Sequence, residues 1–296
     1  MTPFLFLLVP IVGLLLFCSG VIFWTGLSHL KFAYFYRREG IEPAPLSSRE
    51  WIHFYFHTLQ GALSLLWWSI RAAGLAKYRQ PSGSPAGRPV LCVHGIFMNS
   101  TCMWGIRNAL EGAGRGSRAI SLGIPFPTPL AYAGPLTAVM VEMARAFPQT
   151  GYDIVAHSLG GVLIHEVLRR RPELASSIGR VITLGSPHNG TGFLRWMRFG
   201  PVYDTLNRHS TYLRDLPTLR QLAPSIEVTT VASTHDLVVY PTQMAHLEGA
   251  RHVTLEKVSH LGMMVRDEVM RVIVDALAAE SMQPVEESSG KVDGHG

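Results

Sequence analysis

The sequence, 296 residues long, predicts an α/β domain built on a mostly parallel sheet and preceded by a hydrophobic N-terminal segment. Three observations lead to this prediction. Short apolar segments typical of strands alternate with segments of helical periodicity, residues 4–30 contain no charged side chain, and a Pro/Gly/Ser-rich stretch at 80–89 separates the two regions. Alternating strands and helices are typical of a parallel sheet covered by helices on both faces.

The composition indicates extensive burial. Hydrophobic residues make up 47% of the chain but charged residues only 16%, against about 25% in an ordinary globular protein. The formal net charge is +5, yet the 26 Lys and Arg residues are scattered, so we expect weak attraction to anionic lipid and no nucleic-acid partner. Cys18, Cys92 and Cys102 form neither a disulfide framework nor a metal-binding spacing, and we expect them to be packing residues.

The uncharged run at 4–30 predicts a membrane anchor, because a spanning helix needs about 20 apolar residues. The run lacks the basic start, the short apolar core and the small-residue cleavage site of a signal peptide. Basic and aromatic side chains that suit a lipid headgroup region follow it, namely Lys31, Tyr34, Tyr36, Arg37 and Arg38. We therefore predict an uncleaved transmembrane anchor at 1–30, with membrane lipids as partners.

A second apolar stretch at 51–70 lies in the connecting region 31–88. Its polar side chains, His53, His57, Gln60 and Ser64, recur at spacings that form one narrow helical stripe. The stretch is a second span, an interfacial helix or a helix packed on the anchor. One span leaves the following domain in the cytoplasm by the positive-inside rule, and two spans carry it to the opposite side. The polar stripe favours an interfacial helix and a single span.

The α/β domain is predicted at 89–280, and a disordered tail at 281–296. In chain order we expect strand Val90–Val93, helix 104–111, strand 118–122, helix 136–147, strand 152–156, helix Leu159–Arg170, strands 181–184, 226–232 and 252–258, and a final helix at 262–279. Residues 190–224 lack a regular pattern, and we expect them to form a cap over the carboxyl ends of the strands.

Ser158 lies where the predicted strand 152–156 runs directly into a helix. The pattern around it is A-x-S-x-G, with Ala156 and Gly160 two positions away on either side. Small residues let the strand and the helix approach closely, so that a sharp turn lifts the serine hydroxyl into a site, as in a nucleophile elbow. The helix start adds backbone NH groups and the positive end of its dipole. Ser158 is therefore the predicted nucleophile.

A serine nucleophile needs a base, and the base needs an orienting acid. Asp236 follows the penultimate predicted strand and His260 follows the last one. Open α/β sheets build their sites at these strand ends, and the chain order Ser, Asp, His is that of a known triad. A loop carboxylate and a helix-capping histidine are the structural alternatives for each residue alone, but together the three favour catalysis. We expect His157, which precedes the nucleophile, to point elsewhere.

A His-Gly turn after strand Val90–Val93 predicts the oxyanion hole. Such a hole needs two backbone NH groups aimed at the developing negative charge. We predict that Leu159, just after the nucleophile, supplies one NH group and Ile96 the other, with Phe97 as an alternative donor. An ordinary turn with a buried His94 is the structural alternative.

Five segments resemble the bacterial lipase and esterase branch of the α/β-hydrolase superfamily: LCVHGIFMNSTCMW, DIVAHSLGG, VITLGSPHNGT, STHDLVV and VSHLGMM. The resemblance covers about residues 89–279 and implies the α/β-hydrolase fold. It implies the same roles for Ser158, Asp236, His260, Ile96 and Leu159, and a loop around His188 that shapes the site without being catalytic. It also makes the bacterial inner membrane the expected location of the anchor.

The sequence thus predicts a membrane-anchored serine hydrolase that cleaves carboxylic esters through an acyl-enzyme, with a small-molecule or lipid ester as substrate. No metal or organic cofactor is expected, because the His53 and His57 pair has no carboxylate nearby. An acyltransferase or a thioesterase with the same triad remains open, since this fold hosts many chemistries. A membrane-bound scaffold or binding protein that retains the fold is the alternative from a different class.

Overall fold

The computed structural model describes residues 87–96, 98–123, 128–193 and 200–278, together with residues 19, 20, 23, 47–50, 52, 56 and 58–63 of the N-terminal region. Most of the predicted anchor, the stretch 80–86 of the linker and the tail 281–296 lie outside these residues. Within them, no helix is both long enough and apolar enough to cross a membrane.

Six parallel strands form one sheet in the order β2-β1-β3-β4-β5-β6. The strands are β1 (Val90–Val93), β2 (Ser117–Ile120), β3 (Tyr152–His157), β4 (Ile178–Leu184), β5 (Glu227–Ser233) and β6 (Arg251–Leu255). The chain pairs β2 on one side of β1 and then places β3 on the other side. Open α/β sheets bind ligands at such a reversal of strand order, which here lies at the carboxyl ends of β1 and β3.

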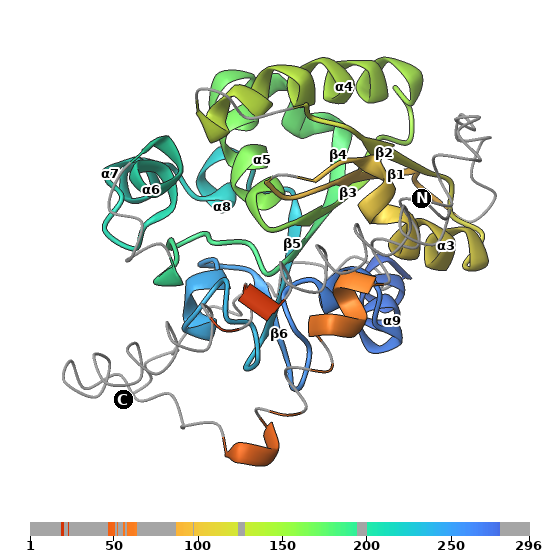
Figure 1. The fold of residues 1–296 in the computed structure, drawn as a ribbon. Coiled ribbons are helices and arrows are strands. Elements are labelled where there is room, and N and C mark those ends of the chain that lie inside the picture. Colours follow the sequence, from red (N-terminus) through yellow and green to blue (C-terminus); the bar gives the residue numbers. More distant parts are fainter. Residues whose placement is uncertain are drawn as a thin grey trace, which may run out of the picture.

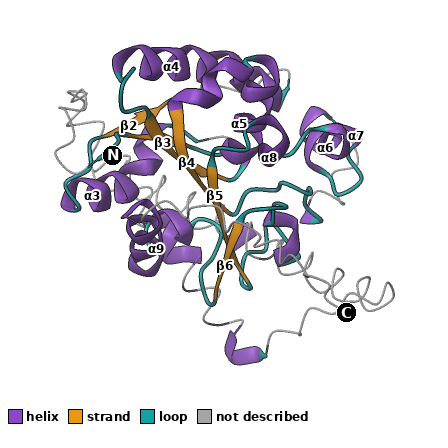
Figure 2. Cartoon of the chain, turned by 180° about the vertical axis from the view of Figure 1, so that it is seen from behind, coloured by secondary structure: helices purple, strands orange, loops and turns teal. Residues whose placement is uncertain are grey.

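Helices cover both faces of the sheet (Figures 1 and 2). They are α3 (Trp104–Gly112), α4 (Ala133–Ala146), α5 (Leu159–Arg170), α6 (Pro201–Leu206), α7 (Thr211–Asp215), α8 (Leu219–Leu222) and α9 (Asp267–Ala278). Alternate residues of β1 enter two cores: Leu91 and Val93 pack with α4 and α5, whereas Val90 and Cys92 pack with α3 and α9. Burial on both faces is the usual state of a parallel strand, and the predicted α/β class is confirmed.

The bounds of several predicted elements differ from the structure by up to three residues, and two predicted segments differ more. The final helix does not begin at Gly262, because a 3-10 turn over Gly262–Met264 precedes α9 at Asp267. Residues 190–224 are not irregular throughout, since α6, α7 and α8 lie within them. Side-chain caps explain two of these short helices: the Ser210 hydroxyl accepts a hydrogen bond from Leu213 N, and Thr218 begins a capping box.

Candidate active site

Ser158 occupies a sharp turn between β3 and α5. Its φ of 54° and ψ of −125° lie in a region that non-glycine residues rarely adopt, and such strain clusters at functional sites. Two contacts hold the turn: Ser158 N donates to Leu184 O at 2.9 Å, and Gly160 lies so close to β1 that a Cβ atom there would be 2.9 Å from Val93 O. The predicted close approach of strand and helix is therefore present, and it places Ser158 at the carboxyl end of β3.

Asp236 and His260 form a buried pair at the ends of the neighbouring strands β5 and β6. The His260 ring nitrogen Nδ1 lies 2.8 Å from Asp236 Oδ2. The other carboxylate oxygen, Oδ1, accepts hydrogen bonds from Val238 N at 2.8 Å and Val239 N at 2.9 Å. With three donors around it, this carboxylate is fixed in direction and favours the tautomer of His260 that carries its proton on Nδ1. That tautomer leaves Nε2 as a proton acceptor.

Gly185, the residue after β4, lies against this pair with φ of +53°. A Cβ atom at this position would be 2.8 Å from Asp236 Oδ2 and 3.1 Å from His260 Nδ1. Only glycine fits such a backbone without displacing the pair. Across the described residues, the His260 ring bonds to Asp236 and not to the Ser158 hydroxyl; contacts between nucleophile and base are often long before substrate binds.

The His-Gly turn after β1 lies against Ser158. A Cβ atom on Gly95 would be 2.9 Å from Ser158 Cβ and 3.4 Å from Ser158 Oγ. His94 Nε2 accepts a hydrogen bond from Leu122 N at 3.0 Å, so Nδ1 carries the proton and donates to Gly95 O at 2.6 Å. Because a trans peptide points its N–H opposite to its C=O, this bond turns the Ile96 N–H away from His94.

Of the two predicted oxyanion donors, Leu159 follows Ser158 at the start of α5, and Ile96 follows Gly95 on the turn that lies against Ser158. Burial lowers the pKa of His94, although its bond to Gly95 O opposes this, and the ring is therefore neutral at neutral pH. The alternative donor Phe97 lies outside the described residues.

His157 was predicted to point elsewhere, and the structure corrects this. Its Nε2 lies 3.0 Å from the backbone oxygen of His260, and the two rings are 4.6 Å apart. Burial, followed by the nearby His260 ring, holds the pKa of His157 well below its usual value. His157 is therefore a neutral donor to the backbone oxygen of His260.

His188 lies beside the site and not in it. Its Nε2 bonds to Thr183 Oγ1 at 3.0 Å, and its ring lies 5.2 Å from that of His165. Burial lowers the pKa of His165 to about 4 and that of His188 well below its usual value. In the described part of the chain, no group of three or more His, Cys, Asp or Glu side chains is arranged to hold a metal ion.

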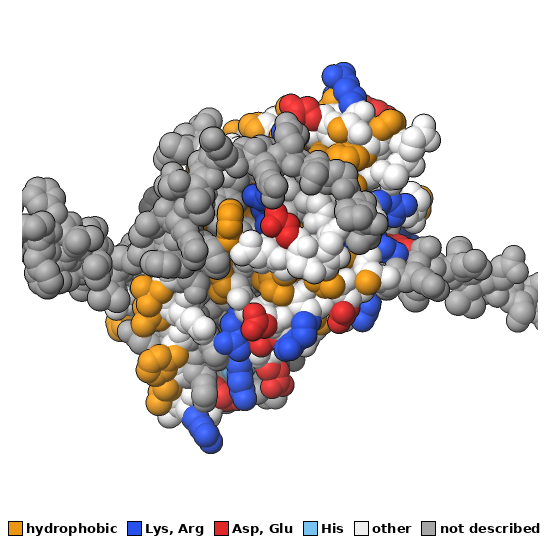
Figure 3. All heavy atoms as spheres, turned by 90° about the vertical axis from the view of Figure 1, so that its right-hand side faces the viewer, with side chains coloured by type: hydrophobic (Ala, Val, Ile, Leu, Met, Phe, Trp, Pro, Cys, Tyr) orange, Lys and Arg blue, Asp and Glu red, His pale blue; other side chains and the backbone are white. Residues whose placement is uncertain are grey.

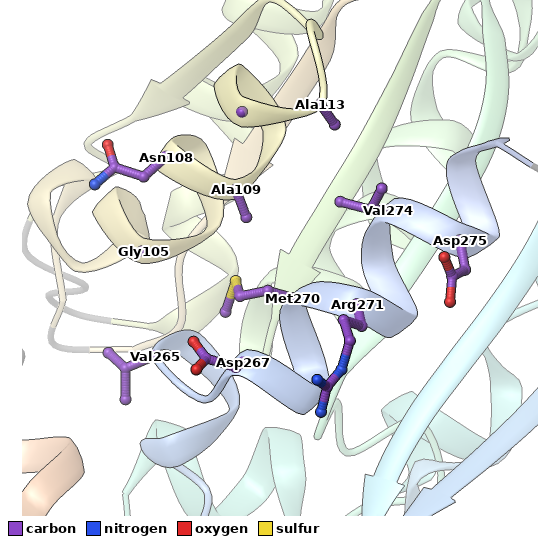
Figure 4. Close-up of a pocket in the computed structure, with 11 residues that line it drawn as sticks. Gly105, Asn108, Ala109, Ala113, Val265, Asp267, Met270, Arg271, Val274 and Asp275 are labelled. Carbon is purple, nitrogen blue, oxygen red and sulfur yellow. The ribbon is translucent and has the colours of Figure 1, made fainter.

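A pocket of about 640 Å³ lies elsewhere, between α3 and α9. Figure 4 shows Asn108 and Ala109 of α3 on one wall, with Met270 and Val274 of α9 on the other. No residue of the predicted triad lines it, so this pocket is separate from the site at the strand ends.

A scan of protein-family models and a search of curated proteins find no match. Solved structures do match. The lipase B of Aspergillus fumigatus superposes with a TM-score of 0.58 at 17% identity, over 69% of this chain and 55% of that one. The mature lipase BlEst2 of Bacillus licheniformis gives 0.55 and 17%, over 69% and 96%. The metagenomic carboxyl esterase MGS0156 gives 0.51 and 16%, over 68% and 78%.

The chain spans about half the length of the A. fumigatus lipase. Likeness at these identities establishes the fold, and the chain has the α/β-hydrolase fold that its motifs indicated. Lipase and esterase activity are properties of those proteins. For this chain the fold alone assigns no activity, because one fold hosts many chemistries.

Proposed function

We propose that the protein is a serine hydrolase that cleaves carboxylic esters through an acyl-enzyme intermediate. The observation that carries the proposal is the buried pair of His260 and Asp236, 2.8 Å apart, beside a serine on a strained strand-to-helix turn. A carboxylate that fixes the tautomer of a histidine next to such a serine has the arrangement of an acyl-transfer site.

In the first step, His260 Nε2 accepts the proton of the Ser158 hydroxyl while Oγ attacks the ester carbonyl. The negative charge that develops on the carbonyl oxygen is stabilised by the NH groups of Ile96 and Leu159, an effect worth a few kcal/mol for each donor. The protonated imidazole gives its proton to the leaving alcohol, and Asp236 stabilises the positive ring. A water molecule, deprotonated by His260, then releases the acid.

Two alternatives share this site. An acyltransferase would use the same residues but pass the acyl group to an alcohol or a thiol in place of water. A thioesterase would use them to hydrolyse a thioester in place of an ester. Product analysis with and without an added acceptor distinguishes them. A scaffold that only retains the fold would not react, so labelling by a fluorophosphonate probe separates it from all three enzymes.

Substitution of the nucleophile tests the proposal. Ser158→Ala should abolish probe labelling and hydrolysis of short activated esters, because only binding and the oxyanion hole remain. Asp236→Asn should reduce the rate by about 10⁴, since the amide favours the wrong tautomer of the base. Turnover at the wild-type rate in Ser158→Ala would overturn the assignment, and a small loss in Asp236→Asn would move the acid to another carboxylate.

We also propose that the protein is attached to a bacterial inner membrane through residues 1–30, with the hydrolase on the cytoplasmic side. The support is the uncharged run at 4–30 followed by Lys31, Arg37 and Arg38. The protein should sediment with membranes and resist extraction by carbonate. A reporter that is active only when exported can be fused after Gln80. Activity of this fusion would contradict the cytoplasmic orientation.

A further inference from the structure

Exposed large hydrophobic side chains are confined to the N-terminal part of the described residues. The large hydrophobic residues that are exposed are Phe23, Ile52, Phe56 and Leu63. None of them belongs to the hydrolase, whose described residues between 87 and 278 keep their large hydrophobic side chains buried or partly buried. Soluble surfaces rarely gather apolar side chains in one place unless something binds there.

Three of these residues, Ile52, Phe56 and Leu63, are helical where the structure describes the range 48–63. The described residues from Ser48 to Leu63 are all helical. The segment begins with a capping box: Glu50 Oε2 accepts from Ser47 N at 2.7 Å, and Glu50 N donates to Ser47 Oγ at 3.4 Å. The start of the helix is therefore specified locally, by the motif Ser-x-x-Glu.

The segment packs directly on the loop that carries the proposed base. Gly61 is buried, and a Cβ atom there would lie 3.1 Å from Gly262 N and 3.2 Å from the carbonyl carbon of Leu261. These are the two residues that follow His260. Beside this contact, Arg266 Nη1 donates to Gln60 Oε1 at 3.5 Å.

The described apolar side chain nearest to this contact in the chain, Leu63, points away from it. Residues 58–63 are all described as helical, and on a helix that turns by about 100° per residue Leu63 falls about 200° from Gly61. The exposed fractions of Ile52, Phe56 and Leu63 are 58%, 63% and 43%. On the face drawn in Figure 3, hydrophobic side chains gather at the lower left while charged side chains spread over the centre.

We propose that the segment 47–63 is an interfacial element that binds the hydrolase through Gly61 and inserts Ile52, Phe56 and Leu63 into the surface of a lipid bilayer. The sequence before it favours lipid over a protein partner, because the uncharged run at 4–30 is followed by Lys31, Arg37 and Arg38, the charge and hydropathy pattern of a membrane surface. The base loop is then held next to the bilayer. The lipid contact itself does not depend on the proposed catalytic activity.

Spin labels test this proposal on the full-length protein in nanodiscs of phosphatidylethanolamine and phosphatidylglycerol. Single cysteines replace Ile52, Phe56 or Leu63 in a Cys18→Ser background, since Cys92 and Cys102 are buried. Asp215→Cys is the aqueous control, because the Asp215 side chain is 70% exposed on the cap. We expect labels at the three apolar positions to collide more often with oxygen than with a water-soluble nickel complex, and the label at position 215 to show the reverse.

Two outcomes would overturn the proposal. Preference for nickel at all three positions would place this face in water. Low collision with both reagents would mean that protein covers it, either another segment of this chain or a second copy. Fluorophosphonate labelling of each variant tests the catalytic proposal separately. If the wild-type protein failed to label, the proposed function would be wrong, but the collision rates would still report on the lipid contact.

Discussion

His157 Nε2 lies 3.0 Å from the backbone carbonyl oxygen of His260, so the residue before Ser158 is tied to the backbone of the proposed base. Both residues are buried, and the bond joins the end of β3 to the loop after β6. Gly95 adjoins the same ring, since a Cβ atom there would lie 3.2 Å from His157 Nδ1. His157 therefore contacts the His260 loop and the turn at Gly95 and adjoins Ser158 in the chain, so that in the proposed mechanism it would act as a positioning residue.

Replacing His157 should slow catalysis without weakening binding. We expect His157→Leu to lower kcat by about tenfold to a hundredfold with KM nearly unchanged, because a misplacement of about 1 Å can cost that much. His157→Gln, whose side-chain NH₂ can reach the His260 carbonyl, should recover much of the loss. Steady-state kinetics with a short activated ester gives both parameters.

The control is His165→Leu, which removes an equally buried histidine that bonds to Pro217 O at 3.3 Å, in the cap. This variant should lose stability but keep kcat. If His157→Leu and His165→Leu reduced kcat alike, or if Gln failed to rescue, His157 would have only a packing role.

Gly185→Ala should disable the acid–base pair. The added Cβ would meet Asp236 Oδ2 at 2.8 Å and Met263 Sδ at 3.0 Å, so the pair must move. Gly200→Ala is the matched control, because Gly200 also has positive φ, +94°, but a Cβ there would meet nothing within 4 Å. In both variants, backbone strain should lower the free energy of unfolding by about 1–3 kcal/mol. Only Gly185→Ala should also lower kcat/KM, by more than about a hundredfold. Equal activity of the two folded variants would contradict the geometry of this site.

The side that His157 faces follows from the sequence, but its partner does not. Successive residues of a strand alternate between faces, and Val155 enters the core with α3 and α9 whereas Ala156 enters the core with α4 and α5. His157 must therefore face the side of Val155. That the loop after β6 covers this side is a tertiary contact, which only the fold reveals.

The same limit explains the other differences. The chain order of Ser158, Asp236 and His260 and their places after strands could be predicted from the sequence, because the motifs around them depend on local residue types. The short helices of the cap have too few turns for a periodic pattern. The late start of α9 depends on α3, since a Cβ atom on Gly105 would lie 2.5 Å from Met264 O, and this packing fixes the chain before Asp267.

Buried histidines should make the protein sensitive to mild acid. Burial lowers the pKa values of His94, His157, His165 and His188, so below about pH 6.5 the unfolded chain binds protons that the folded chain does not. Stability is therefore complete above about pH 6.5 and falls as the pH drops. Each histidine contributes a slope of up to about 1.4 kcal/mol per pH unit.

Urea unfolding between about pH 7 and pH 5, above the range in which most carboxylates titrate, measures this slope. His165→Leu should reduce the slope at pH 5 by nearly one proton, and less toward pH 7, since the folded pKa of His165 is about 4. A slope that does not change in this variant would mean that His165 titrates normally in the folded protein.

The contact of Gly61 with Leu261 and Gly262 predicts that the N-terminal region can be removed only in part. Deleting residues 1–46 leaves the capping box at Ser47 and the helix that covers the base loop, so this form should label with a fluorophosphonate at close to the full-length rate. Deleting residues 1–86 exposes the backbone after His260 and removes the bond from Arg266 to Gln60. We expect the second form to label more slowly and to unfold at a lower urea concentration, because the loop loses a packing partner.

Within the full-length chain, Gly61→Val tests the same contact without a deletion. Its control is Ala62→Val, at the neighbouring and less buried position. Equal labelling rates for both deletions and for Gly61→Val would show that the base loop keeps its geometry without the helix.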